Sequence, residues 1–212
     1  MAKVLYITAN PKSVDESVGL RVGQAFIKSY QDAHPNDEIK ELHLYQEEFP
    51  TVDRDIINGW DRMRREGITF SELSETEQKK INALNEFTDN LIAADKYVFV
   101  SPMWNWGTPP PLKAFIDSFV VVGKTFHYTE YGPVGHLKDK KAIHIQISGG
   151  IYSKGPFAKM DHSHLYLKQV LNIIGISDVD VLYVEGHEFD RERADEIIHT
   201  GILEAKERAT NF

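Results

Sequence analysis

Three short loops of this sequence combine residue types that suit a flat, negatively charged ligand. The first contains two indoles, a thioether and an amide in a row, at Met103-Trp104-Asn105-Trp106. A large aromatic surface with a few hydrogen-bonding groups is typical of pockets for flat heteroaromatic ligands. The alternative is a loop that only packs on the core or on a partner subunit. Asn105 between the two tryptophans favours the ligand interpretation.

The second loop contains paired glycines, at Ser148-Gly149-Gly150 followed by Ile151-Tyr152. Glycine has no Cβ, so its backbone can approach a ligand closely. The N–H groups of such a loop could stabilise negative charge on a ligand. A simple turn explains these residues equally well when they are taken alone.

The third loop runs from Asn10 to Gly19 and leads into a predicted helix near Ser17. Backbone N–H groups at a helix start, together with the Ser17 hydroxyl, could hold a phosphate in the field of the helix N-terminus. Serine is also among the preferred helix N-caps, and capping is the favoured explanation of this loop taken alone. The loop matches neither a Walker A motif nor G-x-G-x-x-G, so it does not specify a nucleoside triphosphate or a dinucleotide.

Each of these loops follows a run of residues that predicts a buried strand. Such runs are rich in β-branched and aromatic residues, and Pro102 ends one of them because proline has no N–H for a strand ladder. Strands are predicted at about 4–8, 38–44, 97–101, 141–147 and 179–184. Helices are predicted at about 17–34, 74–94, 109–121, 162–174 and 191–209, with a short one around 53–65. Residues 123–139 are expected to form a long excursion.

Strands that alternate with helices predict a parallel sheet covered on both faces. We therefore expect an α/β fold over residues 1–212, a single domain built as a flavodoxin-like three-layer sandwich with strand order 2-1-3-4-5. In that order the first, third and fourth strands are neighbours, so the three loops converge at one edge of the sheet. A phosphate site, an aromatic clamp and a turn of backbone donors together suit a mononucleotide with a flat ring, which indicates FMN.

With these motifs the chain resembles the FMN-dependent NADH-azoreductases, also described as NADH:quinone oxidoreductases, of the flavodoxin-like superfamily. The similarity covers nearly the whole length and is most specific in the Pro-Met-aromatic-Asn-aromatic and Thr-Phe-x-Tyr-Thr patterns. The similar segments are Lys3–Thr8, Pro102–Trp106, Gly123–Thr129 with Gly132-Pro133, Ser148–Tyr152 with Gly155-Pro156, and Val184–Gly186.

The resemblance implies which residues contact FMN. The phosphate would be held by the first loop, at Asn10, Ser17, Val18 and Gly19. The isoalloxazine and ribityl groups would contact Pro102, Met103, Trp104, Asn105 and Trp106, and the pyrimidine side would contact Ser148, Gly149 and Gly150. The chain departs from many relatives at Asn10 and Gly19, where serine is common, and from some at Ser148, where arginine occurs. The candidate walls of the substrate site are Trp60, Phe126, Tyr128 and Tyr152, with Trp60 reaching it from residues 45–73, either within the chain or across a dimer interface.

The resemblance also implies an enzyme with a ping-pong scheme. NADH, or NADPH, delivers hydride to flavin N5 and leaves, and a quinone or an aromatic azo compound then takes the electrons at the same face. A homodimer with flavins near its interface is expected. Because the flavin does the chemistry, no catalytic side chain is assigned, which fits a chain without cysteine or a G-x-S-x-G motif.

Two other functions are left open. A flavodoxin-like electron carrier would bind the same cofactor without turning over a substrate, although the insertions at 45–73 and 123–139 favour a substrate pocket. A metal-dependent hydrolase would use Asp161-His162-Ser163-His164. Histidines two positions apart do not share a helix face, so solvated or helix-start histidines are the favoured explanation and no metal is expected.

The bulk composition excludes several classes of protein. The 212 residues are 42% hydrophobic and 26% charged, which is ordinary for a globular domain with a core. The absence of cysteine excludes disulfides and thiolate metal sites. A net charge of −8 without a basic block argues against a nucleic-acid partner. The N-terminus predicts a strand and no signal peptide, and no apolar stretch could span a bilayer, so a cytoplasmic protein without a membrane partner is expected.

Overall fold

Five parallel strands form the central sheet of the computed structural model, which describes residues 1–212. The spatial order is β2-β1-β3-β6-β7, and every neighbouring pair runs parallel. Counted among the parallel strands alone, this is the predicted order 2-1-3-4-5. The strands are β1 (Lys3–Thr8), β2 (Glu38–His43), β3 (Lys96–Pro102), β6 (Lys141–Ser148) and β7 (Asp178–Glu185).

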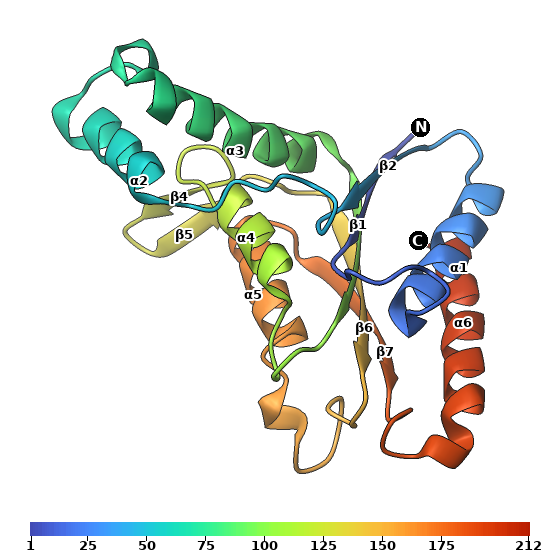
Figure 1. Cartoon of the computed structure of the whole chain (residues 1–212). Helices are drawn as coiled ribbons and strands as arrows, with labels where there is room; N and C mark the ends of the chain where they lie inside the picture. Colours follow the sequence, from blue (N-terminus) through green and yellow to red (C-terminus); the bar gives the residue numbers. More distant parts are fainter.

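Helices cover both faces of the sheet and complete the predicted three layers (Figure 1). Two helices, α1 and α6, cover one face, and α3, α4 and α5 lie on the other side. The helices are α1 (Val18–Ala33), α2 (Arg54–Asp61), α3 (Glu75–Ala93), α4 (Pro110–Phe119), α5 (His164–Ile173) and α6 (Ala194–Thr210). Shorter helical turns occupy Arg62–Glu66, Phe70–Glu72, Ala158–Met160 and Arg191–Arg193. None of the helices is both long and apolar enough to cross a membrane.

The central strands are mostly apolar because both of their faces are buried. In β3, Val98 and Val100 pack toward α1 and α6, whereas Tyr97 and Phe99 belong to the larger core under α3, α4 and α5. This alternation gives the molecule two separate cores, one on each face of the sheet. The continuous apolar runs in the sequence predicted these strands for the same reason.

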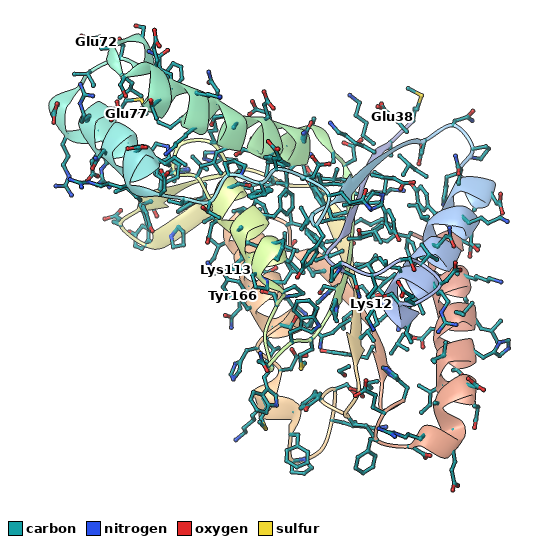
Figure 2. All side chains as sticks on the ribbon, viewed as in Figure 1. Lys12, Glu38, Glu72, Glu77, Lys113 and Tyr166 are labelled. Atoms are coloured by element: carbon teal, nitrogen blue, oxygen red, sulfur yellow. The ribbon has the colours of Figure 1, made fainter.

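A helical arm projects beyond the sheet (Figure 1). It consists of α2, the following turns and the first half of α3, and it encloses a small core of its own formed by Ile56, Leu73, Ile81 and Leu84. The predicted capping box opens α3: Ser74 Oγ accepts from Glu77 N at 3.3 Å, and Glu77 Oε2 accepts from Ser74 N at 2.8 Å. Glu77 lies near the far end of the arm (Figure 2).

Residues 123–139, predicted as a long excursion, contain an antiparallel hairpin of β4 (Phe126–Thr129) and β5 (Gly132–Gly135). The strands are four residues each, and β5 contains glycine and proline, which are depleted in strands. Tertiary contacts stabilise the hairpin instead. A Cβ at Gly135 would lie 2.1 Å from the Gly175 nitrogen, so its backbone packs directly on the end of α5.

Candidate functional site

The three loops singled out in the sequence lie together at the carboxyl edge of the sheet, where β1, β3 and β6 end. Two backbone hydrogen bonds extend the strand pairing into the loops and hold their first residues side by side. Ala9 N donates to Val100 O at 2.9 Å, and Met103 N donates to Ile147 O at 2.7 Å. Figure 1 shows this edge at the bottom of the sheet, opposite the projecting arm.

In the loop after β1, the Ser17 hydroxyl caps α1 and keeps its own proton uncommitted. Ser17 Oγ accepts from Leu20 N at 3.2 Å and from Asn10 Nδ2 at 3.0 Å, and both partners are donors. The N–H groups of Val18 and Gly19 donate to no protein atom. Capping and phosphate binding are therefore compatible roles of Ser17. Uncommitted N–H groups at a helix start form a ready anion site.

Gly19 has a packing reason to lack a side chain. A Cβ at this position would lie 2.8 Å from Ile147 Cδ1. Ile147 belongs to β6, the strand that leads into the loop Ser148–Ile151, called here the glycine loop. The first turn of α1 therefore sits close to β6, and the two loops are near neighbours. Lys12, labelled in Figure 2, belongs to the same loop and is exposed.

The loop after β3 is a tight turn closed by two reciprocal backbone bonds of 3.0 Å between Trp104 and Gly107. Asn105 and Trp106, between them, have φ angles of 49° and 64°, in the left-handed region that non-glycine residues rarely adopt. The N–H groups of both residues and the Asn105 side-chain amide make no hydrogen bond within the protein. The side chains of Trp104 and Trp106 are 40% and 46% exposed. The turn thus presents two indoles and free polar groups beside half-buried Pro102 and Met103.

The loop after β6 is arranged so that its carbonyl groups are used and its N–H groups are free. Gly186 N donates to Ser148 O and Gly150 O at 3.1 and 3.2 Å, and Phe189 N donates to Gly149 O at 3.0 Å. The N–H groups of Gly149, Gly150 and Ile151 donate to no protein atom. They are the third set of uncommitted donors at this edge.

Glu185, at the end of β7, holds in place Tyr152 and Ser153, the two residues that follow the glycine loop. Its Oε2 accepts from Tyr152 N at 2.7 Å and from Ser153 N at 3.0 Å, and its other oxygen accepts from the Ser153 hydroxyl. This role of Glu185 is not among the predictions made from the sequence. The available signal was an acidic residue followed by Gly186 directly after the fifth predicted strand, at the same sheet edge.

Of the four predicted substrate-site residues, the structure brings one to this edge. The ring of Tyr152 packs over the glycine loop, since a Cβ at Gly150 would lie 3.0 Å from its Cε2. Tyr128 is 69% exposed on the hairpin, away from the edge, and its ring meets Phe126 edge-to-face at 5.3 Å. Phe126 itself is buried in the main core. Trp60 packs on the core of the arm, at the opposite end of the molecule.

The histidines of the Asp161–His164 segment do not gather around a common point. His162 is exposed, whereas His164 begins α5 and stacks on His144 with ring centroids 5.6 Å apart. Burial lowers the pKa of His144 to about 3, with a further contribution from His164, so the imidazole is neutral. No group of three or more histidine or acidic side chains is arranged to hold a metal ion.

The free groups at the carboxyl edge fit a phosphorylated flat ring. A helix start with two free N–H groups and a free hydroxyl proton suits a phosphate. Two exposed indoles provide aromatic surface, and two further sets of backbone donors suit the polar edge of a ring that gains negative charge. All of these groups belong to loops anchored on three adjacent strands.

Comparison with known proteins gives a consistent result. The family described as "Flavodoxin-like fold" matches residues 2–209. The chain is 48% identical over 212 residues to the FMN-dependent NADH:quinone oxidoreductase 2 of Bacillus subtilis and 49% identical to the FMN-dependent NADH:quinone oxidoreductase of Geobacillus kaustophilus, with 100% of each chain covered. It is also similar to an azoreductase crystal structure from Bacillus anthracis, with a TM-score of 0.92, 37% identity and 100% of both chains covered. An FMN-dependent NADH-azoreductase from Bacillus anthracis in complex with FMN has a TM-score of 0.90 at 31% identity, covering 100% of this chain and 99% of the other.

Proposed function

This chain belongs to the family of FMN-dependent NADH:quinone oxidoreductases, and we propose that it binds FMN at the carboxyl edge of its sheet and uses NADH to reduce quinones. The observation that supports the proposal most strongly is the convergence of three sets of uncommitted hydrogen-bond donors with two exposed indoles. Each set alone has a structural explanation. Their meeting at one edge supports a ligand that uses all three sets at once.

The residues would divide the cofactor between them. The Ser17 hydroxyl and the N–H groups of Val18 and Gly19 would hold the phosphate. Trp104 and Trp106 would cover the ring system, with Met103 beside them and the Asn105 amide at its polar edge. The N–H groups of Gly149 and Gly150 would face the pyrimidine side and stabilise the negative charge that it gains on reduction.

When bound, FMN supplies the redox chemistry, accepting hydride from NADH and giving two electrons to the final acceptor. For a quinone the balance is NADH, one proton and quinone giving NAD⁺ and hydroquinone. We propose a ping-pong order, in which NAD⁺ leaves before the acceptor occupies the same place, because Trp104 and Trp106 are both exposed on one turn and would offer flat molecules a single binding surface. An aromatic azo compound would take two NADH and two protons and leave as two amines. We propose NADPH as a second hydride donor.

We also propose that the protein forms a homodimer. The hairpin exposes Tyr128, Tyr131 and Val134 by 69%, 91% and 39%, and the adjoining Val122 by 60%. An exposed apolar group of this kind is typical of a protein interface. In a dimer, the hairpin and the arm with Trp60 would be able to reach the partner's carboxyl edge, which they do not reach in their own chain. The cytoplasmic location stays a prediction.

The alternative function is a flavodoxin-like electron carrier that binds FMN without turning over a substrate. The two functions are separated by steady-state oxidation of NADH by the FMN-loaded protein, with menadione as acceptor and absorbance at the NADH band as readout. We expect oxidation that depends on both FMN and menadione. A protein that binds FMN tightly but does not oxidise NADH would be assigned to the electron carriers.

A further inference from the structure

A buried polar cluster lies directly beneath the carboxyl edge, between the sheet and the start of α5. On this face β3 and β6 are apolar at Phe99 and Ala142 but become polar toward their ends. The cluster consists of Ser101, His144, Gln146, Asp161, His164 and Tyr183, of which all but Tyr183 are at most 3% exposed. Buried polar groups are costly unless they are hydrogen-bonded, so a cluster of this size requires an explanation.

The Asp161 carboxylate accepts four hydrogen bonds in this cluster. Its Oδ1 accepts from the N–H groups of Ser163 and His164, at 2.9 and 3.0 Å, and so caps the start of α5. Its Oδ2 accepts from Gln146 Nε2 on β6 at 2.9 Å and from the Tyr183 hydroxyl on β7 at 3.3 Å. One carboxylate therefore ties the first turn of a helix to two strands of the sheet.

His162, which follows Asp161 directly, holds the turn Trp104–Gly107, called here the indole turn. His162 N donates to Trp106 O at 2.9 Å and is shared with Met160 O at 3.0 Å. Trp106 and Asn105 are the two consecutive left-handed residues of that turn. Left-handed conformations of non-glycine residues persist only where their surroundings hold them. The His162 N–H is the one backbone bond that links this strained pair to the rest of the fold.

We propose that Asp161 is a positioning residue for the indole turn: by fixing residue 162 it holds Asn105 and Trp106 in the conformation that receives the flavin ring. The proposal rests on the proposed function for its ligand, but its structural part concerns the turn alone. Asp161 itself does not touch the ligand, because it is 2% exposed and its oxygens are fully engaged.

The conservative substitution Asp161→Asn is a control for the loss of charge at this position, because an asparagine can keep the hydrogen bonds of the cluster. The remaining Oδ1 still accepts from Ser163 N and His164 N. The new amide would need an acceptor on the strand side, and Gln146 Oε1 is buried without a partner. Rotation of the Gln146 amide would bring that oxygen to the new NH₂ group. We therefore expect Asp161→Asn to retain the turn, whereas Asp161→Ala removes the four bonds together.

The test combines two readouts on the full chain. The first is the exchange rate of the Trp104, Gly107 and His162 amides without FMN, which reports on the turn whether or not the protein binds flavin. The second is the dissociation constant for FMN. For Asp161→Ala we expect faster exchange of these amides and roughly tenfold weaker FMN binding, the equivalent of about 1.4 kcal/mol. For Asp161→Asn we expect both quantities within about twofold of the wild type.

Val170→Ala provides the matched control, because it removes buried contacts of α5 without touching the cluster. It should lower stability and leave both readouts unchanged. If Asp161→Ala fails to fold, Asp161→Ser keeps a short capping oxygen and loses the strand contacts, and faster exchange of the three amides is expected there too.

Wild-type exchange and affinity in the folded Asp161→Ala protein, or equal effects in Val170→Ala, would overturn the proposal. Failure of the wild type to bind FMN would refute the proposed function and leave the exchange comparison valid.

Discussion

Replacing Ser17 by alanine separates the two roles that the structure allows for its hydroxyl. The oxygen, 4% exposed, caps Leu20 N and accepts from the Asn10 amide. Loss of a serine cap costs about 1 kcal/mol, and the lost bond to Asn10 adds roughly 0.5–1.5 kcal/mol. The free energy of unfolding should therefore fall by about 2 kcal/mol.

The effect on FMN depends on the hydroxyl proton, which no protein group uses. A hydrogen bond to a charged group contributes about 1.5–3 kcal/mol, so its loss should weaken FMN binding by roughly tenfold to a hundredfold. Urea unfolding without FMN measures the first quantity, and fluorescence titration with FMN measures the second. Ser13→Ala is the matched control, since the Ser13 hydroxyl is exposed and bonds only to Glu16. A loss of stability in Ser17→Ala with unchanged FMN affinity would reduce Ser17 to a helix cap and refute the phosphate assignment.

Three further predictions concern other parts of the fold. Because burial lowers the pKa of His144 from 6.5 to about 3, the unfolded chain binds a proton between these pH values that the folded chain does not, so the free energy of unfolding should fall by about 2 kcal/mol from pH 7 to pH 5 for this residue. His144→Gln should flatten that slope in urea titrations at each pH, and an unchanged slope would contradict the burial of a neutral imidazole. Gly135→Ala should destabilise the protein by about 3 kcal/mol or more, because its Cβ would overlap backbone at 2.1 Å from the Gly175 nitrogen; thermal unfolding within a degree of the wild type would refute that packing. Glu185→Ala should weaken FMN binding by roughly fivefold with little change in fold, because it removes all three bonds that fix Tyr152 and Ser153; wild-type affinity would show that the glycine loop needs no such anchor.

The sheet and its three loops were predictable because the signals are local. The apolar runs before Thr8, Ser101 and Ser148 are those of strands buried on both faces, and turn residues follow each run directly. The strand order then placed the loops together without any knowledge of side-chain contacts. The capping box at Ser74 is equally local and is confirmed.

The features that escaped prediction depend on contacts between distant segments. The hairpin of β4 and β5 is too short to show in the sequence, and it exists because Gly135 packs on the end of α5. Asp161 was weighed only as a metal ligand, since the sequence does not show that Gln146 and Tyr183 point at its carboxylate. The substrate-site assignments of Trp60 and Tyr128 stay predictions, because they need the partner chain of the proposed dimer.

The binding of FMN to the purified protein tests this description of the carboxyl edge most directly. We expect titration with FMN to saturate at one molecule per chain, to quench flavin fluorescence because Trp104 and Trp106 would lie against the ring in the proposed site, and to perturb the flavin absorption bands. The bound FMN should be released on denaturation. A protein that leaves the absorption and fluorescence of added FMN unchanged up to saturating concentrations would contradict the assignment of the three loops to a flavin site.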